Sequence, residues 1–136
     1  MGNAGTYIAS RASLPERSAA WRRLRDVDGW KITSTWIDEA GAGETVDLGL
    51  LWERIAAEIE QSERLVLYVE PGDFPLKGAL IEVGIALAHR IPIRVVAPGV
   101  ALEPQSFRPI GSWVRHPLVS FCDSMNDALI GATVSM

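Results

Sequence analysis

Short apolar runs alternate along this chain with longer segments that have the apolar spacing of a helix, and this alternation constrains the fold more than any other feature. Runs with the composition of β-strands occur at residues 6–9, 31–37, 65–69, 91–96 and 118–122. Helical spacing separates them, and a short helical segment follows the last run. The run at 65–69 is almost wholly apolar, which is typical of a central strand that helices cover on both faces.

The order of these elements predicts an α/β fold of the doubly wound, Rossmann-like class, with five parallel strands and helices on both faces. We expect helices over residues 13–27, 45–61 and 76–89. With 136 residues, of which 48% are hydrophobic, the chain is long enough to bury a normal core. We therefore expect residues 1–136 to form a single domain.

Charge and composition exclude several classes of function. The net charge of −4 gives no basic surface for nucleic acid, and no apolar run approaches the ~20 residues that span a bilayer. Cys122 has no second cysteine to pair with, which favours a reducing compartment, the cytoplasm. His89 and His116 are far apart in the sequence and lack the spacing of metal ligands, so we expect no metal or other cofactor.

A cluster of arginines lies in the first predicted helix, and acidic residues surround it. Mixed charges of this kind are typical of the solvated face of a helix. We therefore expect the arginines to be exposed; they are Arg17, Arg22, Arg23 and Arg25.

In a doubly wound sheet, ligands bind outside the carboxyl ends of the strands, where the strand order reverses. Ser10 and Arg11 follow the first strand, Trp36 ends the second and Asp73 follows the third, so we expect these four residues near a ligand. Asp73 also has the position of a turn residue after Pro-Gly. Neither a dinucleotide fingerprint nor a P-loop is present in the sequence, so a phosphate would rest on Ser10, Arg11 and the helix N-terminus that follows.

One carboxylate, Glu82, interrupts the apolar helix after the third strand, between Ile81 and Val83. An ionised carboxylate away from water is costly unless partners compensate it. Glu82 is therefore either a structural residue, paired with Arg11 or with a nearby hydroxyl group, or a functional residue with a perturbed pKa.

Three motifs resemble nucleoside 2-deoxyribosyltransferases, above all the short phage and bacterial forms, and the related deoxynucleoside-monophosphate N-glycosidases. They are Tyr7-Ile8-Ala9-Ser10-Arg11, Ser34-Thr35-Trp36-Ile37 and Gly78-x-x-x-Glu82-x-Gly84-x-Ala86, and the resemblance covers roughly residues 6–98. It implies an enzyme that cleaves the N-glycosidic bond of a deoxynucleoside or deoxynucleotide, or transfers the deoxyribosyl group. It also implies a homodimer or higher homo-oligomer.

The resemblance assigns the role of nucleophile to Glu82. A carboxylate at C1′ can stabilise an oxocarbenium-like centre or form a covalent glycosyl-enzyme. Tyr7 could orient Glu82 through a hydrogen bond, Trp36 could stack on the base, and Gly78 opens the motif beside the substrate.

The sequence departs from the family at positions that usually assist this carboxylate. An Asp about eight residues before the third strand is replaced by Ile55, with Glu53 and Glu58 nearby. Ala79, Leu80 and Ile81 replace polar residues. Two alternatives stay open: a protein that binds a nucleotide-like ligand or a protein partner without catalysis, and a Glu-dependent hydrolase of NAD-like dinucleotides.

Overall fold

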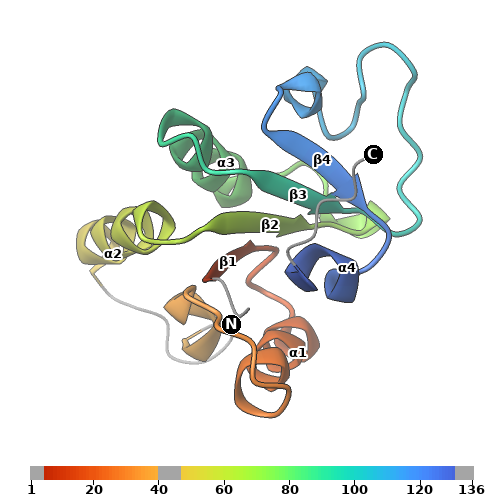
Figure 1. Cartoon of the computed structure of the whole chain (residues 1–136). Coiled ribbons are helices and arrows are strands. Elements are labelled where there is room, and N and C mark those ends of the chain that lie inside the picture. Colours follow the sequence, from red (N-terminus) through yellow and green to blue (C-terminus); the bar gives the residue numbers. More distant parts are fainter. Residues whose placement is uncertain (1–4, 40–46, 131–136) are drawn as a thin grey trace.

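The computed structural model describes residues 5–39 and 47–130 and consists of a parallel sheet between two layers of helices (Figure 1). Four strands pair in the order β1-β2-β3-β4. The strands are β1 (Thr6–Ala9), β2 (Arg64–Tyr68), β3 (Ile93–Val96) and β4 (Val119–Cys122). The predicted doubly wound α/β class is confirmed.

Four α-helices cover the sheet: α1 (Pro15–Asp26), α2 (Leu48–Glu60), α3 (Gly78–Ala88) and α4 (Met125–Ile130). Helices α2 and α3 pack together on one face, and α1 and α4 lie on the other (Figure 1). Successive side chains of β2 point to opposite faces of the sheet, which fits this arrangement. Leu65 and Leu67 belong to the larger apolar core, whereas Val66 packs with Val96 and Ala128 in a smaller cluster under α4.

The prediction of five strands is wrong in one element. Residues 31–37 form only a parallel bridge, between Thr6 and Ile32, and then a 3-10 turn, η1 (Thr35–Asp38). Side chains replace the missing backbone partners of β1: the Ser34 hydroxyl accepts from the Ile8 N–H at 3.1 Å, and the Trp36 indole N–H donates to the Ile8 carbonyl at 2.8 Å. The periodicity of the sequence cannot predict that side chains, rather than a strand, bond the backbone of β1.

The bridge at Ile32 lies on the outer side of β1, whereas β2 lies on its other side. The strand order therefore reverses between β1 and β2, and the carboxyl ends of these two strands form the edge at which ligands bind in this class of fold. Two more 3-10 turns follow strand ends or loops, η2 (Pro71–Asp73) after β2 and η3 (Ser112–Arg115) before β4.

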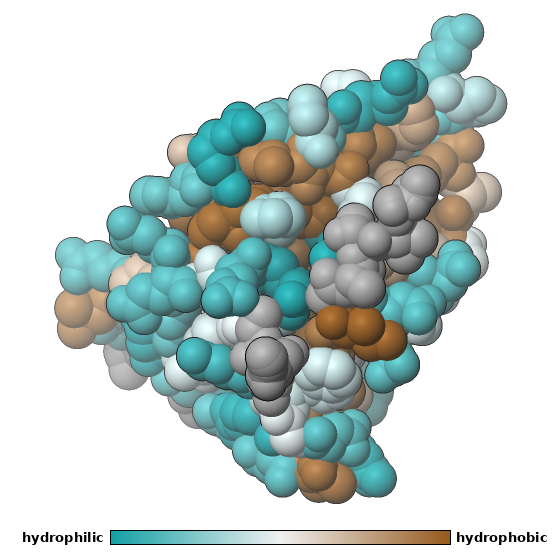
Figure 2. Space-filling model, viewed as in Figure 1, coloured by the Kyte–Doolittle hydropathy of each residue, from teal (hydrophilic) through white to brown (hydrophobic). Residues whose placement is uncertain are grey.

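The surface seen from the side of Figure 1 is mostly hydrophilic (Figure 2). Hydrophobic residues gather in a band across the upper half of this face, and hydrophilic residues border the band. In the part of the chain that the structure describes, no helix is long and apolar enough to cross a membrane.

Candidate active site

Tyr7 of β1 and Glu82 of α3 meet at the reversal point of the sheet. The Tyr7 hydroxyl donates a 2.9 Å hydrogen bond to Oε2 of Glu82. Tyr7 is fully buried, and Glu82 is only 7% exposed. Of the two partners expected for a structural Glu82, the hydroxyl group is present, whereas the Arg11 guanidinium lies elsewhere, against the Gly72 carbonyl and the Ser13 hydroxyl.

Burial dominates the electrostatics of this pair. Removal from water raises the pKa of Glu82 from 4.5 to about 7, although the hydrogen bond from Tyr7 opposes the rise. Burial and the neighbouring carboxylate raise the pKa of Tyr7 far above its ordinary range, so that its hydroxyl stays protonated. Glu82 therefore titrates near neutrality beside a fixed hydrogen-bond donor.

A cavity of about 940 Å³ opens at this edge of the sheet, and Glu82 is part of its wall. All five residues that we expected to bind a substrate line it: Ser10, Arg11, Trp36, Asp73 and Gly78. Tyr7 lies outside the lining and is hydrogen-bonded to Glu82, which is part of it. The structure thus brings together every site residue that the sequence suggested.

Ser10 is the least satisfied polar group of the cavity wall. Its Oγ is shielded from solvent and has no hydrogen-bond partner among the described residues. A buried hydroxyl without a partner carries an energetic cost that a ligand atom can relieve. Ser10 is therefore an unpartnered hydroxyl at the cavity wall, and the exposed Arg11 next to it carries a positive charge.

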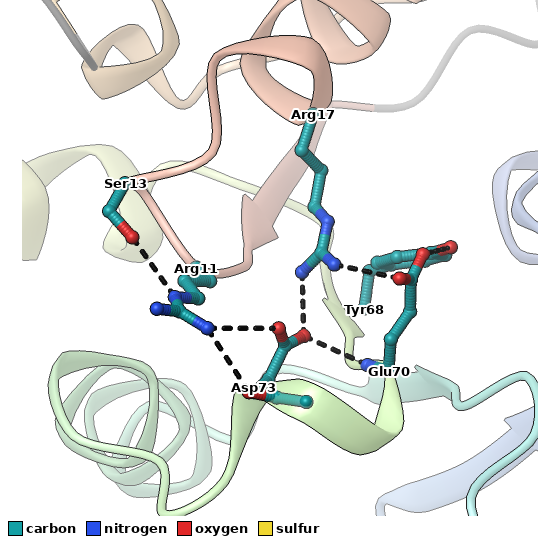
Figure 3. Close-up of polar contacts among 7 residues, drawn as sticks. Arg11, Ser13, Arg17, Tyr68, Glu70 and Asp73 are labelled. Carbon is teal, nitrogen blue, oxygen red and sulfur yellow. Dashed lines mark hydrogen bonds and ion pairs between the residues drawn. The ribbon is translucent and has the colours of Figure 1, made fainter.

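Asp73 is held by a network that also fixes the turn after β2 (Figure 3). Oδ2 of Asp73 accepts from Arg17 at 2.6 Å and from the Glu70 N–H at 2.8 Å. Arg17 also pairs with Glu70 at 3.0 Å and lies over the Tyr68 ring. The other oxygen, Oδ1, is 4.0 Å from Arg11. Asp73 is thus both a turn residue, as its Pro-Gly context indicates, and part of the cavity wall.

The network corrects the expectation that the arginines of α1 are exposed. Arg17 is only 7% exposed, because α1 turns it toward η2 rather than toward solvent. Arg22 and Arg25 are half-buried: Arg22 donates to the Ile37 carbonyl, and Arg25 pairs with Asp26 and Asp38. Arg23 is exposed, as expected. The sequence signal for a buried arginine was the pair of acids after β2, Glu70 and Asp73, because two neighbouring carboxylates need a positive charge to compensate them.

No family model matches the sequence, and no curated protein matches it either. Solved structures do match. A 2-deoxyribosyltransferase from the psychrotolerant bacterium Bacillus psychrosaccharolyticus superposes with a TM-score of 0.67 at 11% identity, over 92% of this chain and 90% of that chain. The chain has the 2-deoxyribosyltransferase fold. The CMP N-glycosidase of Clostridium botulinum matches with a TM-score of 0.51 at 14% identity, over 92% of this chain and 94% of that chain.

Helix α2 gives the cavity an apolar wall. Ile55, at the position where the resemblance implies an Asp, is 4% exposed and lines the cavity. Glu58 is not among the lining residues and accepts from the backbone N–H and the hydroxyl of Thr35, at the start of η1. Glu53 is exposed. Neither acid takes the place of the missing Asp at the cavity.

Sequence reasoning missed several cavity residues, chiefly Trp52, Glu39 and Lys77. Trp52 could have been found, because it continues the apolar spacing of α2 between Leu48 and Ile55. The Trp52 ring lies 3.6 Å from where a Cβ would stand on Gly78, so α2 and α3 approach closely there. Among the described residues, no three His, Cys, Asp or Glu side chains form a metal-binding group.

Proposed function

We propose that this protein cleaves the N-glycosidic bond of a nucleoside or nucleotide, or transfers its glycosyl group, with Glu82 as the nucleophile. The observation that carries the proposal is the position of Glu82: at the cavity wall, at the reversal point of the sheet, with its carboxylate held by the Tyr7 hydroxyl. The fold likeness to a 2-deoxyribosyltransferase and to a CMP N-glycosidase supports the same chemistry.

The reaction needs a carboxylate close to C1′ as positive charge develops there. Ionised Glu82 attacks C1′, the bond to the base breaks, and the resulting glycosyl-enzyme is resolved by water or by a second base. The pKa of Glu82, about 7, makes both the ionised and the neutral form accessible near neutral pH. Tyr7 fixes the direction of the attacking oxygen and does not lose its own proton.

The remaining residues of the cavity wall are assigned to binding the base and the polar end of the substrate. We assign Trp36 to stacking on the base, since its indole N–H is tied to the Ile8 carbonyl and its ring lines the cavity. Ser10 and Arg11 bind the polar end of the substrate. The Ser13 hydroxyl and the Gly72 carbonyl position Arg11, with Asp73 4.0 Å away, and Gly78 leaves room beside Trp52.

The test is a panel of 2′-deoxynucleosides and their 5′-monophosphates, with release of the free base followed by chromatography. We expect turnover by the wild-type protein and at least ~100-fold less by Glu82→Ala and Glu82→Gln. Glu60→Gln, an exposed acid on α2, is the matched control and should keep full activity. Wild-type turnover that survives Glu82→Gln would contradict the proposal.

A second candidate is binding without turnover, and the apolar wall at Ile55 favours it, since no acid of α2 lies where the family has one. In that case nucleotides would raise the melting temperature without forming product, and Glu82→Gln would still bind them. The same panel separates the two functions.

We also propose that the chain is a homodimer or larger homo-oligomer in the cytoplasm. Four large apolar side chains are exposed on the adjoining helices α2 and α3, namely Leu48, Leu50, Leu80 and Ile81. Such a patch is typical of an interface. Because Leu48 also lines the cavity, a second copy on this patch would lie beside the site. Cys122 is a free thiol, which fits a reducing compartment.

A further inference from the structure

Three carboxylates face the cavity among the described residues, and only one has no arginine partner. Glu39 binds the Arg54 guanidinium through both oxygens at 3.0 Å. Asp73 accepts from Arg17 at 2.6 Å. Glu82 alone accepts from a neutral hydroxyl. Since Glu82 is the proposed nucleophile, it cannot also deliver a proton to the leaving group in the same step.

No second proton donor stands near Glu82 in the described lining. The lining contains no His, Cys or Tyr, and the residues of α2 in it are all apolar or aromatic, namely Leu48, Leu51, Trp52 and Ile55. The Tyr7 hydroxyl is engaged by Glu82 itself. Lys77 also lines the cavity, but it is exposed to solvent. The described part of the cavity can therefore attack a sugar but is poorly equipped to protonate a departing base.

Cleavage of a neutral N-glycoside depends on such a proton, because the departing base otherwise carries a negative charge. General acid catalysis typically contributes 10²- to 10⁴-fold. A base that is already a cation needs no proton, since it departs as a neutral molecule. We infer that this protein acts on N-glycosides with a cationic heterocyclic leaving group, of which pyridinium glycosides such as nicotinamide nucleosides, nucleotides and dinucleotides are the simplest class.

The inference rests on the proposed function and specifies its substrate. Glu82 forms a bond to C1′ as the bond from C1′ to the pyridinium nitrogen breaks. The electron pair of that bond stays on nitrogen, which neutralises the ring. Water then attacks C1′ of the glycosyl-enzyme, the sugar departs with a hydroxyl group, and Glu82 is regenerated as one proton passes to solvent.

The aromatic lining points to the same ligand class. Trp36 and Trp52 both line the cavity. Indole rings attract planar cations through their π faces more strongly than the other aromatic side chains do. Leu51 and Ile55 add apolar side chains to the wall on the α2 side. Such a wall suits a flat cationic ring better than a base that must form hydrogen bonds along its edge.

The experiment compares substrates that differ in charge but hardly in shape. The full-length protein is incubated with nicotinamide mononucleotide and with its reduced, uncharged dihydro form, and in parallel with the 2′-deoxynucleoside panel. We expect release of nicotinamide from the charged form at least ~100-fold faster than release of base from the reduced form or from any neutral deoxynucleoside. Glu82→Gln should abolish the release, whereas Glu60→Gln should retain it.

The possible outcomes distinguish this inference from the proposed function. Release of base from neutral deoxynucleosides at a rate equal to or above that from the pyridinium substrate would overturn the inference and leave the function of Glu82 standing. Release from neither class would overturn both. Release of nicotinamide that persists in Glu82→Gln would also overturn both, because the chemistry would then belong to another residue.

Discussion

Arg17 and Asp73 are 56 residues apart in the chain, yet Nη1 of Arg17 lies 2.6 Å from Oδ2 of Asp73, and both side chains are almost fully buried. This ion pair joins α1 to the turn after β2. Because Arg11 bonds the Gly72 carbonyl of that same turn, the pair also supports one side of the cavity. Removing one member of a buried pair leaves the other charge without compensation.

We therefore expect Arg17→Met to lower the free energy of unfolding by about 3 kcal/mol. Arg23→Met is the matched control, since Arg23 lies exposed on the same helix, and it should change stability by less than ~0.5 kcal/mol. Urea unfolding followed by tryptophan fluorescence measures both. Equal stability of the two variants would show that solvent, and not Asp73, satisfies Arg17.

Glu82 links stability to pH. Its pKa is about 7 in the folded protein, against 4.5 for the ordinary group, so the folded state binds more protons than the unfolded state between these values. Stability should therefore fall as the pH rises from about 4.5 to about 7, and a cost of about 3 kcal/mol persists above that. The difference in free energy of unfolding between Glu82→Gln and the wild type should therefore grow, in favour of the variant, by about 2 to 3 kcal/mol as the pH rises from 5 to 8. A pH-independent difference would contradict the raised pKa.

The sequence predicted the features that depend on local spacing. The order of the elements follows from their periodicity, and helix α3 was expected at 76–89 and spans Gly78–Ala88. The reversal rule for doubly wound sheets placed Ser10, Trp36 and Asp73 at one edge, because that rule depends only on strand order. Tyr7 could be paired with Glu82 through the resemblance alone, since no local pattern joins β1 to α3.

The errors arose where a distant residue decides the local structure. Residues 31–37 have strand propensity, but the side chains of Ser34 and Trp36 bond the backbone N–H and carbonyl of Ile8, which a neighbouring strand would otherwise bond. Glu58 holds Thr35 in a 3-10 turn. Arg17 lies among charged residues, but Asp73 draws it inward. In each case a tertiary contact overrides a valid local preference.

Tyr7 should tune the acidity of Glu82. The hydrogen bond from Tyr7 lowers the pKa of Glu82, so Tyr7→Phe should raise that pKa above about 7 and reduce the ionised fraction at neutral pH. The pH profile of kcat should shift to higher pH, with ~10-fold less activity at pH 7. Tyr68→Phe removes a similar bond, to Glu70, away from the main cavity and should leave the profile in place. A loss of activity without a shift would mean that Tyr7 supports only packing.

The exposed apolar patch on α2 and α3 makes a prediction about assembly. Ile81 is 56% exposed, and Glu at this position would place a charge in the middle of the proposed interface. Light scattering at micromolar concentration should give an oligomeric mass for the wild type and a monomeric mass for Ile81→Glu. Val27→Glu is the control, because Val27 is 66% exposed just beyond α1, far along the chain from this patch, and should leave the mass unchanged. A wild-type protein that is itself monomeric at this concentration would contradict the proposed homo-oligomer.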